Sequence, residues 1–205
     1  MLRFATIFMC LFMVFTVSAD QVILQPTLSL AKDSYICEGN PSGNYGQEEG
    51  LLISLSSSGD TMTLICFNEL DDYVGVTVNS AELEFYVEYI NELIYVSAQL
   101  IDESWNEDDV TWANRPALMP GTDIDFTIPD FGCWQTLDIT DYGIEWLENG
   151  VANNGFYMMY DSTTYRTATL CSGQGSDPTY APRLILDYTP LAVETASWGA
   201  IKVLE

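Results

Sequence analysis

Apolar and polar side chains alternate along much of this chain, a pattern typical of strands that bury one face. The clearest case is Ser80–Ile90, in which every second residue is apolar and most of the residues between them are acidic. Other strand-length segments alternate in the same way or are short apolar runs. They span residues 33–37, 51–55, 62–67, 93–101, 124–128, 134–139, 156–160, 167–171 and 183–188.

Turn-forming residues separate these segments. Gly, Asn and Pro crowd residues 38–46, and residues 56–60 predict a hairpin. A single helix is predicted, with Thr140 or Asp141 as its cap and Asn149-Gly150 at its end. About nine strands with one short helix predict an all-β fold, an antiparallel β-sandwich of the jelly-roll type.

The two ends of the chain differ from this pattern. Arg3 precedes an apolar run, and small residues stand at Val17 and Ala19, which predicts a cleaved signal peptide at residues 1–19. The apolar run is too short to span a membrane comfortably. We therefore expect a secreted protein, extracellular or at the cell surface, with one jelly-roll domain at 20–189. Residues 190–205 form a tail containing Trp198, for which an added edge strand, a sorting signal and disorder are all compatible explanations.

Acidic residues dominate the charge. The formal net charge is −24, and removing residues 1–19 makes it one unit more negative because only Arg3 is lost. Such a charge argues against nucleic acid, anionic membranes and unassisted capture of a polyanionic glycan. Two interpretations remain open: a solvated acidic surface, or calcium sites built from clustered carboxylates.

Cysteine and histidine usage limits the chemistry further. Four cysteines follow the signal peptide, and an even number in an exported chain predicts two disulfides with three possible pairings; they are Cys37, Cys66, Cys133 and Cys171. The chain has no histidine, which excludes histidine-based catalytic triads. Carboxylate pairs are too abundant to indicate a glycosidase, and no other catalytic motif is present. We predict a protein that is not an enzyme.

One loop, Ser104–Pro116 (SWNEDDVTWANRP), combines tryptophans with acids between two predicted strands. Its acidic residues form the candidate calcium site: Asp102, Glu103, Glu107, Asp108 and Asp109. Their spacing does not match an EF-hand, so solvated charge is the alternative. Asp123 and Asp125, on alternate positions of a strand, are a weaker pair.

Six segments, in this order, resemble the DNRLRE (disaggregatase-related) domain, also classed as carbohydrate-binding module family 96. They are residues 33–46 (DSYICEGNPSGNYG), 63–70, 80–89, 102–116, 134–161 and 176–188 (SDPTYAPRLILDY). The resemblance implies a jelly-roll module that recognises polysaccharide outside the cell. The family usually has a basic residue in the strand that corresponds to residues 62–67, where this chain has Met62 and Cys66 instead.

Aromatic residues are the natural candidates for stacking on sugar rings. The tryptophans belong to the shared family pattern, so we favour a packing role over a ligand role for Trp105 and Trp112. Tyrosines are better ligand candidates: Tyr45, Tyr73, Tyr160, Tyr165 and Tyr180. Cations are scarce, and each of Arg115, Arg166 and Arg183 is expected to pair with a carboxylate. Arg166, next to Tyr165, is the candidate for a sugar hydroxyl or carboxylate.

Two functional hypotheses follow. The first is a secreted, non-catalytic module that binds an extracellular or cell-wall polysaccharide, with calcium as its possible cofactor. The second is a structural subunit of a surface layer, matrix or fibre, which self-associates through strand edges or through the tail.

Overall fold

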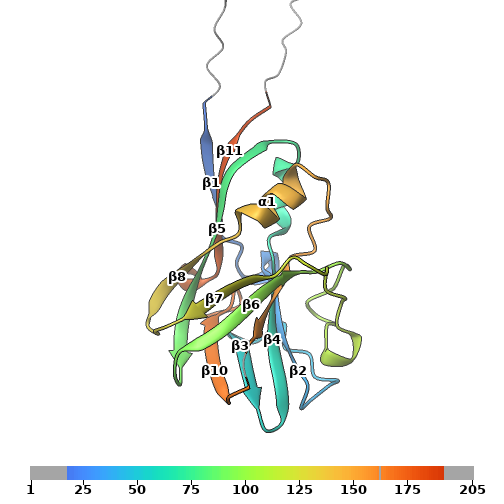
Figure 1. Cartoon of the computed structure of the whole chain (residues 1–205), viewed down its shortest axis with the longest axis vertical. Helices are drawn as coiled ribbons and strands as arrows, with labels where there is room; N and C mark the ends of the chain where they lie inside the picture. Colours follow the sequence, from blue (N-terminus) through green and yellow to red (C-terminus); the bar gives the residue numbers. More distant parts are fainter. Residues whose placement is uncertain (1–17, 162, 192–205) are drawn as a thin grey trace, which may run out of the picture.

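The computed structural model describes residues 18–161 and 163–191 (Figure 1). This part of the chain contains eleven strands, one α-helix and four short 3-10 helices. The strands are β1 (Asp20–Leu24), β2 (Lys32–Cys37), β3 (Gly50–Ser56), β4 (Gly59–Cys66), β5 (Thr77–Ile90), β6 (Ile94–Leu100), β7 (Ile124–Ile128), β8 (Cys133–Asp138), β9 (Phe156–Tyr160), β10 (Arg166–Cys171) and β11 (Arg183–Thr189). The helix is α1 (Thr140–Leu147).

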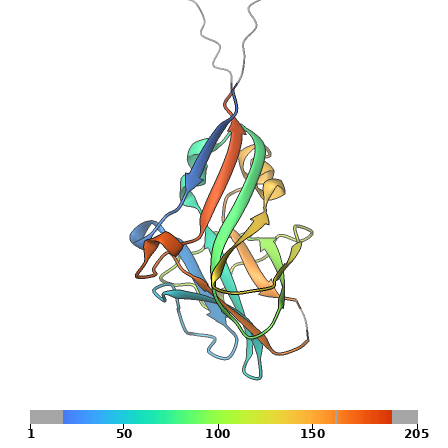
Figure 2. The same cartoon turned by 90° about the vertical axis from the view of Figure 1, so that its left-hand side faces the viewer.

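The strands form two packed layers, and every strand pair is antiparallel. Layer I contains β2, β4, β9, β6 and β7, and layer II contains β8, β5, β11, β1, β10 and β3. The β3–β4 hairpin connects the layers at one side, so hydrogen bonding is continuous around the sandwich. Figure 2 shows β1, β11 and β5 side by side in layer II. The predicted all-β antiparallel sandwich is confirmed.

The alternation of β5 explains why the layers pack as they do. Its apolar positions, among them Leu83, Phe85 and Val87, are at most 1% exposed and face layer I. Its acidic positions Glu82 and Glu88 face outward and are exposed. The same rule holds in β6, β7 and β9, so one apolar core fills the space between the layers.

Helix α1 covers one end of this core. Asp138, rather than Thr140 or Asp141, supplies the side chain at its start: its Oδ1 accepts the N–H of Thr140 at 2.9 Å and the hydroxyl at 2.7 Å. These hydrogen bonds lower the pKa of Asp138. Gly143 permits close packing on β5, because a Cβ there would lie 3.0 Å from the Cβ of Ala81.

Sequence analysis missed strand β1. It lies at residues 20–24 and pairs with β11 alone. The predicted domain 20–189 runs from the first residue of β1 to the last residue of β11. Most of the predicted signal peptide, and nearly all of the predicted tail with Trp198, lie outside the described residues.

The two predicted disulfides are wrong for the described chain, in which all four cysteines are free: Cys37, Cys66, Cys133 and Cys171. Cys37 and Cys66 stand at opposite ends of the β2–β4 ladder, roughly 17 Å apart at the usual rise per residue. Cys133 on β8 and Cys171 on β10 are separated by β5, about 10 Å across the sheet. Every other pairing would join a cysteine of layer I, Cys37 or Cys66, to a cysteine of layer II, Cys133 or Cys171. Because a disulfide needs Cα atoms within about 7 Å, an even number of cysteines was not sufficient for pairing.

Candidate functional site

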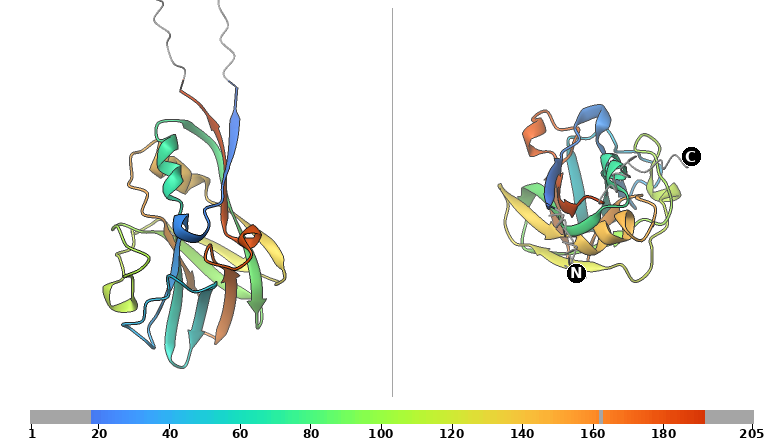
Figure 3. Two further views of the ribbon diagram at one scale, coloured as in Figure 1. Left: turned by 180° about the vertical axis from the view of Figure 1, so that it is seen from behind. Right: turned by 90° about the horizontal axis from the view of Figure 1, so that it is seen from above.

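The tryptophan loop, residues 102–117, folds over the outer face of layer I beside β2 (Figure 3). It covers outward-facing apolar residues of β2, β4 and β9 and creates a second, smaller core around Ile36, Leu64 and Tyr157. Trp105 and Trp112 pack against this core, so the expected packing role is confirmed. The loop is therefore a structural cover for the part of this face formed by β2, β4 and β9.

Side-chain hydrogen bonds attach the loop to its neighbours. The Asn44 amide donates to the backbone carbonyls of Glu107 and Val110 at 2.7 and 2.9 Å. Trp105 Nε1 donates to the carbonyl of Asn154 at 2.8 Å. The loop is thus held from both the 38–49 segment and the chain before β9.

A buried polar network also anchors the loop. Asp33 is 4% exposed, and it accepts hydrogen bonds from the Ser172 hydroxyl at 2.6 Å and from the Gly173 N–H at 2.7 Å. Glu107 Oε1 accepts the Asp33 N–H at 3.1 Å and the Gln174 side chain at 3.2 Å. Burial raises the pKa of Asp33, and it raises the pKa of Glu107 to about 7. Loss of solvation outweighs the hydrogen bonds in both cases.

The candidate calcium residues do not converge; they are Asp102, Glu103, Glu107, Asp108 and Asp109. Glu103 accepts the backbone N–H of Ala117, and Asp108 accepts the side chain of Gln47, while Glu107 points into the buried network. Within residues 18–161 and 163–191, no three acidic, thiol or imidazole side chains gather closely enough to hold a metal ion. Calcium binding stays a prediction that this arrangement does not favour.

The part of layer I that the loop leaves open carries a hollow. Strand register places Met159, Ser97 and Asp125 side by side on the outward face of β9, β6 and β7. With Met62, Asp123, Tyr160 and Asp161 they line a cavity of about 540 Å³. Two further hollows, of about 430 and 290 Å³, adjoin it around the edge strand β7. We refer to these three hollows together as the β7 cleft.

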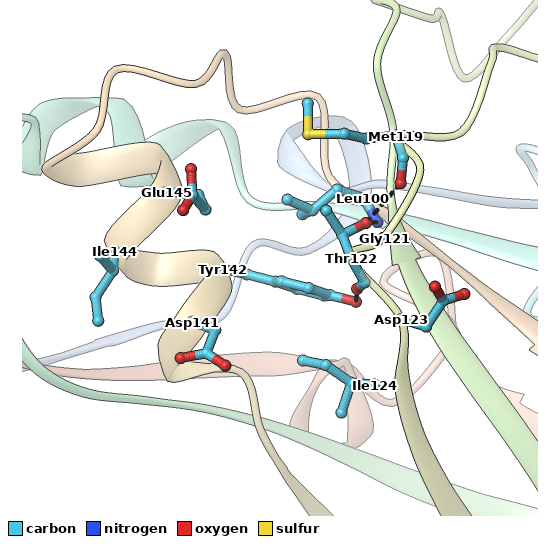
Figure 4. A pocket seen from close by; sticks show the side chains of 10 residues that line it. All are labelled: Leu100, Met119, Gly121, Thr122, Asp123, Ile124, Asp141, Tyr142, Ile144 and Glu145. Carbon is cyan, nitrogen blue, oxygen red and sulfur yellow. Dashed lines mark hydrogen bonds between the residues drawn. The ribbon is translucent and has the colours of Figure 1, made fainter.

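Figure 4 shows the inner part of the β7 cleft, between α1 and the segment that leads into β7. The ring of Tyr142 crosses from α1, and its hydroxyl donates to the carbonyls of Ala98 and Thr122 at 2.8 and 2.6 Å. Asp141 and Glu145 project from α1, and Asp123 lies on the opposite side. Carboxylates from helix and strand therefore line one continuous surface around a rigid aromatic support.

Among the residues that the structure describes, no cation lines the β7 cleft. The four described cations all have partners elsewhere: Lys32 Nζ lies 4.7 Å from the Trp105 ring centroid, Arg115 lies 4.5 Å from that of Trp112, Arg166 pairs with Glu92, and Arg183 pairs with Glu84. Carboxylate pairing is thus confirmed for Arg166 and Arg183, whereas Arg115 stacks on an aromatic ring instead. The surface keeps acceptors for hydroxyl groups but has no free positive charge for an anion.

The predicted sugar-binding tyrosines are scattered. Tyr45 stacks on Tyr35 with ring centroids 4.2 Å apart, and Tyr73 packs edge-on against Tyr188. Tyr160 packs against the main core and also lines the outer hollow of the β7 cleft, where its hydroxyl is hydrogen-bonded to that of Thr164 at 2.9 Å. Of these three tyrosines, Tyr160 is therefore brought into the β7 cleft, whereas Tyr45 and Tyr73 pack against other tyrosine rings.

Tyr165 and Arg166 are brought together as predicted. Tyr165 is 64% exposed, and both residues line a shallow hollow of about 390 Å³ with Ser54 and Asn91. Sequence reasoning missed Ser97, Met159 and Asp161 in the β7 cleft. The alternation of residues 124–128 in the sequence was enough to place Asp125 on the outward face of its strand. The register between strands, which brings Asp125 next to Ser97 and Met159, could not be read from the sequence.

A two-layer antiparallel sandwich with an open, carboxylate-lined cleft on one outer face defines a β-sandwich binding module. The profile of carbohydrate-binding module family 96 matches residues 25–188, most of the chain. The chain belongs to carbohydrate-binding module family 96. The matched range contains β2 to β10, all but the last residue of β11, the tryptophan loop and the β7 cleft, and it begins just after β1.

Other comparisons add little. No curated protein matches the chain. Among solved structures, the cryo-EM structure of mud crab tombus-like virus is similar at 10% identity and a TM-score of 0.31, covering 90% of this chain and 87% of that chain. A likeness at that level carries no functional argument. Within the described residues, no helix has the length and apolar character needed to cross a membrane.

Proposed function

We propose that this protein is a secreted, non-catalytic module that binds a neutral polysaccharide in the β7 cleft. Family membership supports carbohydrate as the ligand, because the matched family consists of binding modules. The basic and apolar start of the chain supports export. The family assignment and the absence of histidine support a role in binding rather than catalysis.

The observation that carries the choice of ligand is the lining of the β7 cleft. Carboxylates accept hydrogen bonds and, when ionised, cannot donate them, so Asp123, Asp125 and Asp161 suit sugar hydroxyl groups. Hydrogen bonds to a charged acceptor are stronger than those between neutral groups. The same carboxylates repel a uronate or sulfate group, and no cation is nearby to offset that repulsion. A neutral glycan is the class of polysaccharide that fits.

Affinity electrophoresis tests this proposal. The full chain is run in gels containing xyloglucan, galactomannan, mixed-linkage β-glucan or alginate. We expect retardation by at least one neutral polysaccharide and none by alginate. Asp125→Ala should weaken the retardation about tenfold or more, since a hydrogen bond to a charged group contributes about 1.5–3 kcal/mol.

The matched control is Glu82→Ala, which removes an exposed outward acid from layer II. It should bind as the wild type does, although the change in net charge is the same. Stronger retardation by alginate than by every neutral glycan would contradict the proposal. Equal weakening by both substitutions would show that total charge, rather than the cleft, controls binding.

Self-association is the second candidate function, and one observation favours it. Among the strands of the described residues, β7 pairs with β6 alone and β1 pairs with β11 alone, so each has one edge without a partner there. Free strand edges can pair with another chain. Light scattering across a hundredfold range of protein concentration tests this alternative. A constant monomer mass would exclude assembly through these edges.

A further inference from the structure

We propose that a second sugar-binding pocket lies on layer II, walled by Tyr180, and that it holds a single neutral pyranose ring. This inference rests on the proposed function, because it assigns a further contact for the same class of ligand. The pocket, which we call the Tyr180 pocket, has a volume of about 240 Å³. Glu49, Glu88, Cys171, Ser176 and Asp177 line it together with Tyr180.

Other aromatic side chains support the ring of Tyr180 on the side away from the pocket. Tyr180 ends a short 3-10 helix (Pro178–Tyr180) and is 38% exposed. Its ring centroid lies 4.4 Å from that of Tyr86, which is in turn 5.7 Å from that of Trp134. Tyr86 and Trp134 are cross-strand partners on β5 and β8, so the sheet itself fixes their positions.

Arg183 completes this support. Its guanidinium lies 4.5 Å from the Trp134 ring centroid, while its Nε donates to Glu84 at 2.5 Å. Asp177 fixes the short helix, because its Oδ1 accepts the N–H and hydroxyl of Thr179 at 3.0 and 2.6 Å. A partly exposed ring with a rigid backing is the arrangement that stacking on the C–H face of a pyranose needs, since little side-chain entropy is lost on binding.

The polar lining selects the class of ring. Glu49 and Glu88 provide hydroxyl acceptors beside Tyr180, and no cation lines the pocket. Arg183, on the nearby strand, is already paired with Glu84 and stacked on Trp134. An acidic sugar would therefore meet uncompensated negative charge, whereas a neutral ring can stack and donate hydrogen bonds.

The size and position of the pocket set its role. A volume of about 240 Å³ corresponds to about eight water molecules in the liquid, which is on the scale of one sugar ring rather than a chain segment. Glu88 and Cys171 take outward positions on layer II, whereas the outer part of the β7 cleft opens on layer I. The two sites therefore face different sides of the sandwich, and one molecule can contact two glycan chains.

Substitutions of Tyr180 test the stacking. Binding is measured by affinity electrophoresis against the member of the neutral panel, namely xyloglucan, galactomannan or mixed-linkage β-glucan, that retards the wild type most. We expect Tyr180→Ala to weaken binding about three- to tenfold, the scale of one aromatic contact. Tyr180→Phe should retain most of the affinity. Tyr95→Ala is the matched control, because Tyr95 is an exposed tyrosine that lines neither site.

The outcomes separate this inference from the proposed function. If the wild type binds a neutral glycan, Asp125→Ala weakens it and Tyr180→Ala does not, the Tyr180 pocket is overturned and the β7 cleft stands. If the wild type binds none of the panel, the proposed function fails, and this inference fails with it. Equal losses for Tyr180→Ala and Tyr95→Ala would also overturn the pocket, because they would indicate a non-specific effect.

Cys171 provides a second readout inside the pocket. It lines the pocket, and burial raises the pKa of its thiol to about 11, so alkylation by iodoacetamide at pH 8.5 is slow enough to follow. Cellohexaose and mannohexaose serve as probes, and peptide mass spectrometry measures the rate at each cysteine. We expect one of them to slow alkylation of Cys171 severalfold and to leave Cys37 unchanged. Unchanged rates at Cys171 with both oligosaccharides, or equal slowing at Cys37, would overturn the pocket.

Discussion

Part of the outer face of layer I is covered, whereas the acidic outward positions of β5 on layer II are open. On layer I, the outward residues of β2, β4 and β9 include Ile36, Leu64 and Tyr157, and the tryptophan loop covers them to form a second core. On layer II, β5 turns Glu82 and Glu88 outward, and these two positions stay exposed to solvent. The outward positions of each strand therefore decide where the chain adds a cover and where it leaves a surface for ligands.

The comparison also separates aromatic residues with a packing role from those that can contact a ligand. Trp105 and Trp112, in the most conspicuous motif of the sequence, lie under or within the cover. Tyr180, in a less conspicuous segment, lies on the open face and walls a pocket. Aromatic residues that pack between polypeptide segments contribute to stability, whereas those with a free face remain able to stack on a ligand.

The largest expected effect is on the covered face. Tyr157→Ala should lower the free energy of unfolding by about 3–5 kcal/mol, because it empties the second core. It also removes the hydrogen bond from the tyrosine hydroxyl to the Pro116 carbonyl at 3.2 Å. Urea denaturation measures the change. The control is Tyr95→Ala, because Tyr95 is an exposed tyrosine of the same layer, and it should change the free energy of unfolding by less than about 0.5 kcal/mol. Similar losses for the two variants would contradict the division into covered and open regions.

A smaller effect is expected from the attachment of the cover. Asn44→Ala removes the two hydrogen bonds to the loop carbonyls of Glu107 and Val110, and it should cost about 1 kcal/mol because water can replace part of them. Hydrogen exchange should show faster opening of the loop than of β5. Asn79→Ala, on layer II, is the control. If loop exchange were unchanged in the Asn44 variant, the loop would be held by packing alone.

The pH dependence of the cover gives a third test. Burial raises the pKa of Glu107 from its ordinary 4.5 to about 7, so the folded protein holds this proton more tightly than the unfolded chain does. The stability associated with this proton is fully present below pH 4.5 and is lost as the pH rises toward 7. Glu107→Gln keeps an oxygen acceptor for Asp33 and Gln174 but cannot ionise.

The variant should therefore show a smaller loss of stability between pH 4.5 and pH 7.5 than the wild type, as measured by urea titrations at several pH values. Asp33, whose pKa is also raised, is present in both proteins, and its charge contributes to the raised pKa of Glu107, so the difference reports the two carboxyl groups as a coupled pair. Parallel pH profiles for the two proteins would contradict the assignment to Glu107.

Calcium should have the smallest effect. The loop carboxylates of Glu103, Glu107 and Asp108 accept hydrogen bonds from different partners, so the described part of the chain offers no ready-made site. Adding 5 mM calcium chloride or EDTA should leave Tm unchanged, since only a ligand that prefers the native state stabilises it. A calcium-dependent rise in Tm would require the loop to rearrange and would revive the metal hypothesis.

Periodicity was enough to predict the sandwich and most of its strands, because a half-buried strand shows its two faces in the sequence. It was not enough for β1, whose stability depends on pairing with β11 at the other end of the chain. The same limit applies to function. Met159, Ser97 and Asp125 meet only through the register of three strands, and Cys133 and Cys171 are kept apart by a fourth.

The pairing of β1 with β11 has a mechanical consequence. Asp20, the first residue of β1, lies opposite Tyr188, the penultimate residue of β11, and both strands leave the sandwich at the same end (Figure 1). A force that pulls the chain apart at these two points loads the hydrogen bonds one pair after another, as in a zipper, rather than all at once in shear. Under tension, β1 would separate from β11 first. The layers that carry the β7 cleft and the Tyr180 pocket would bear the load only after that separation.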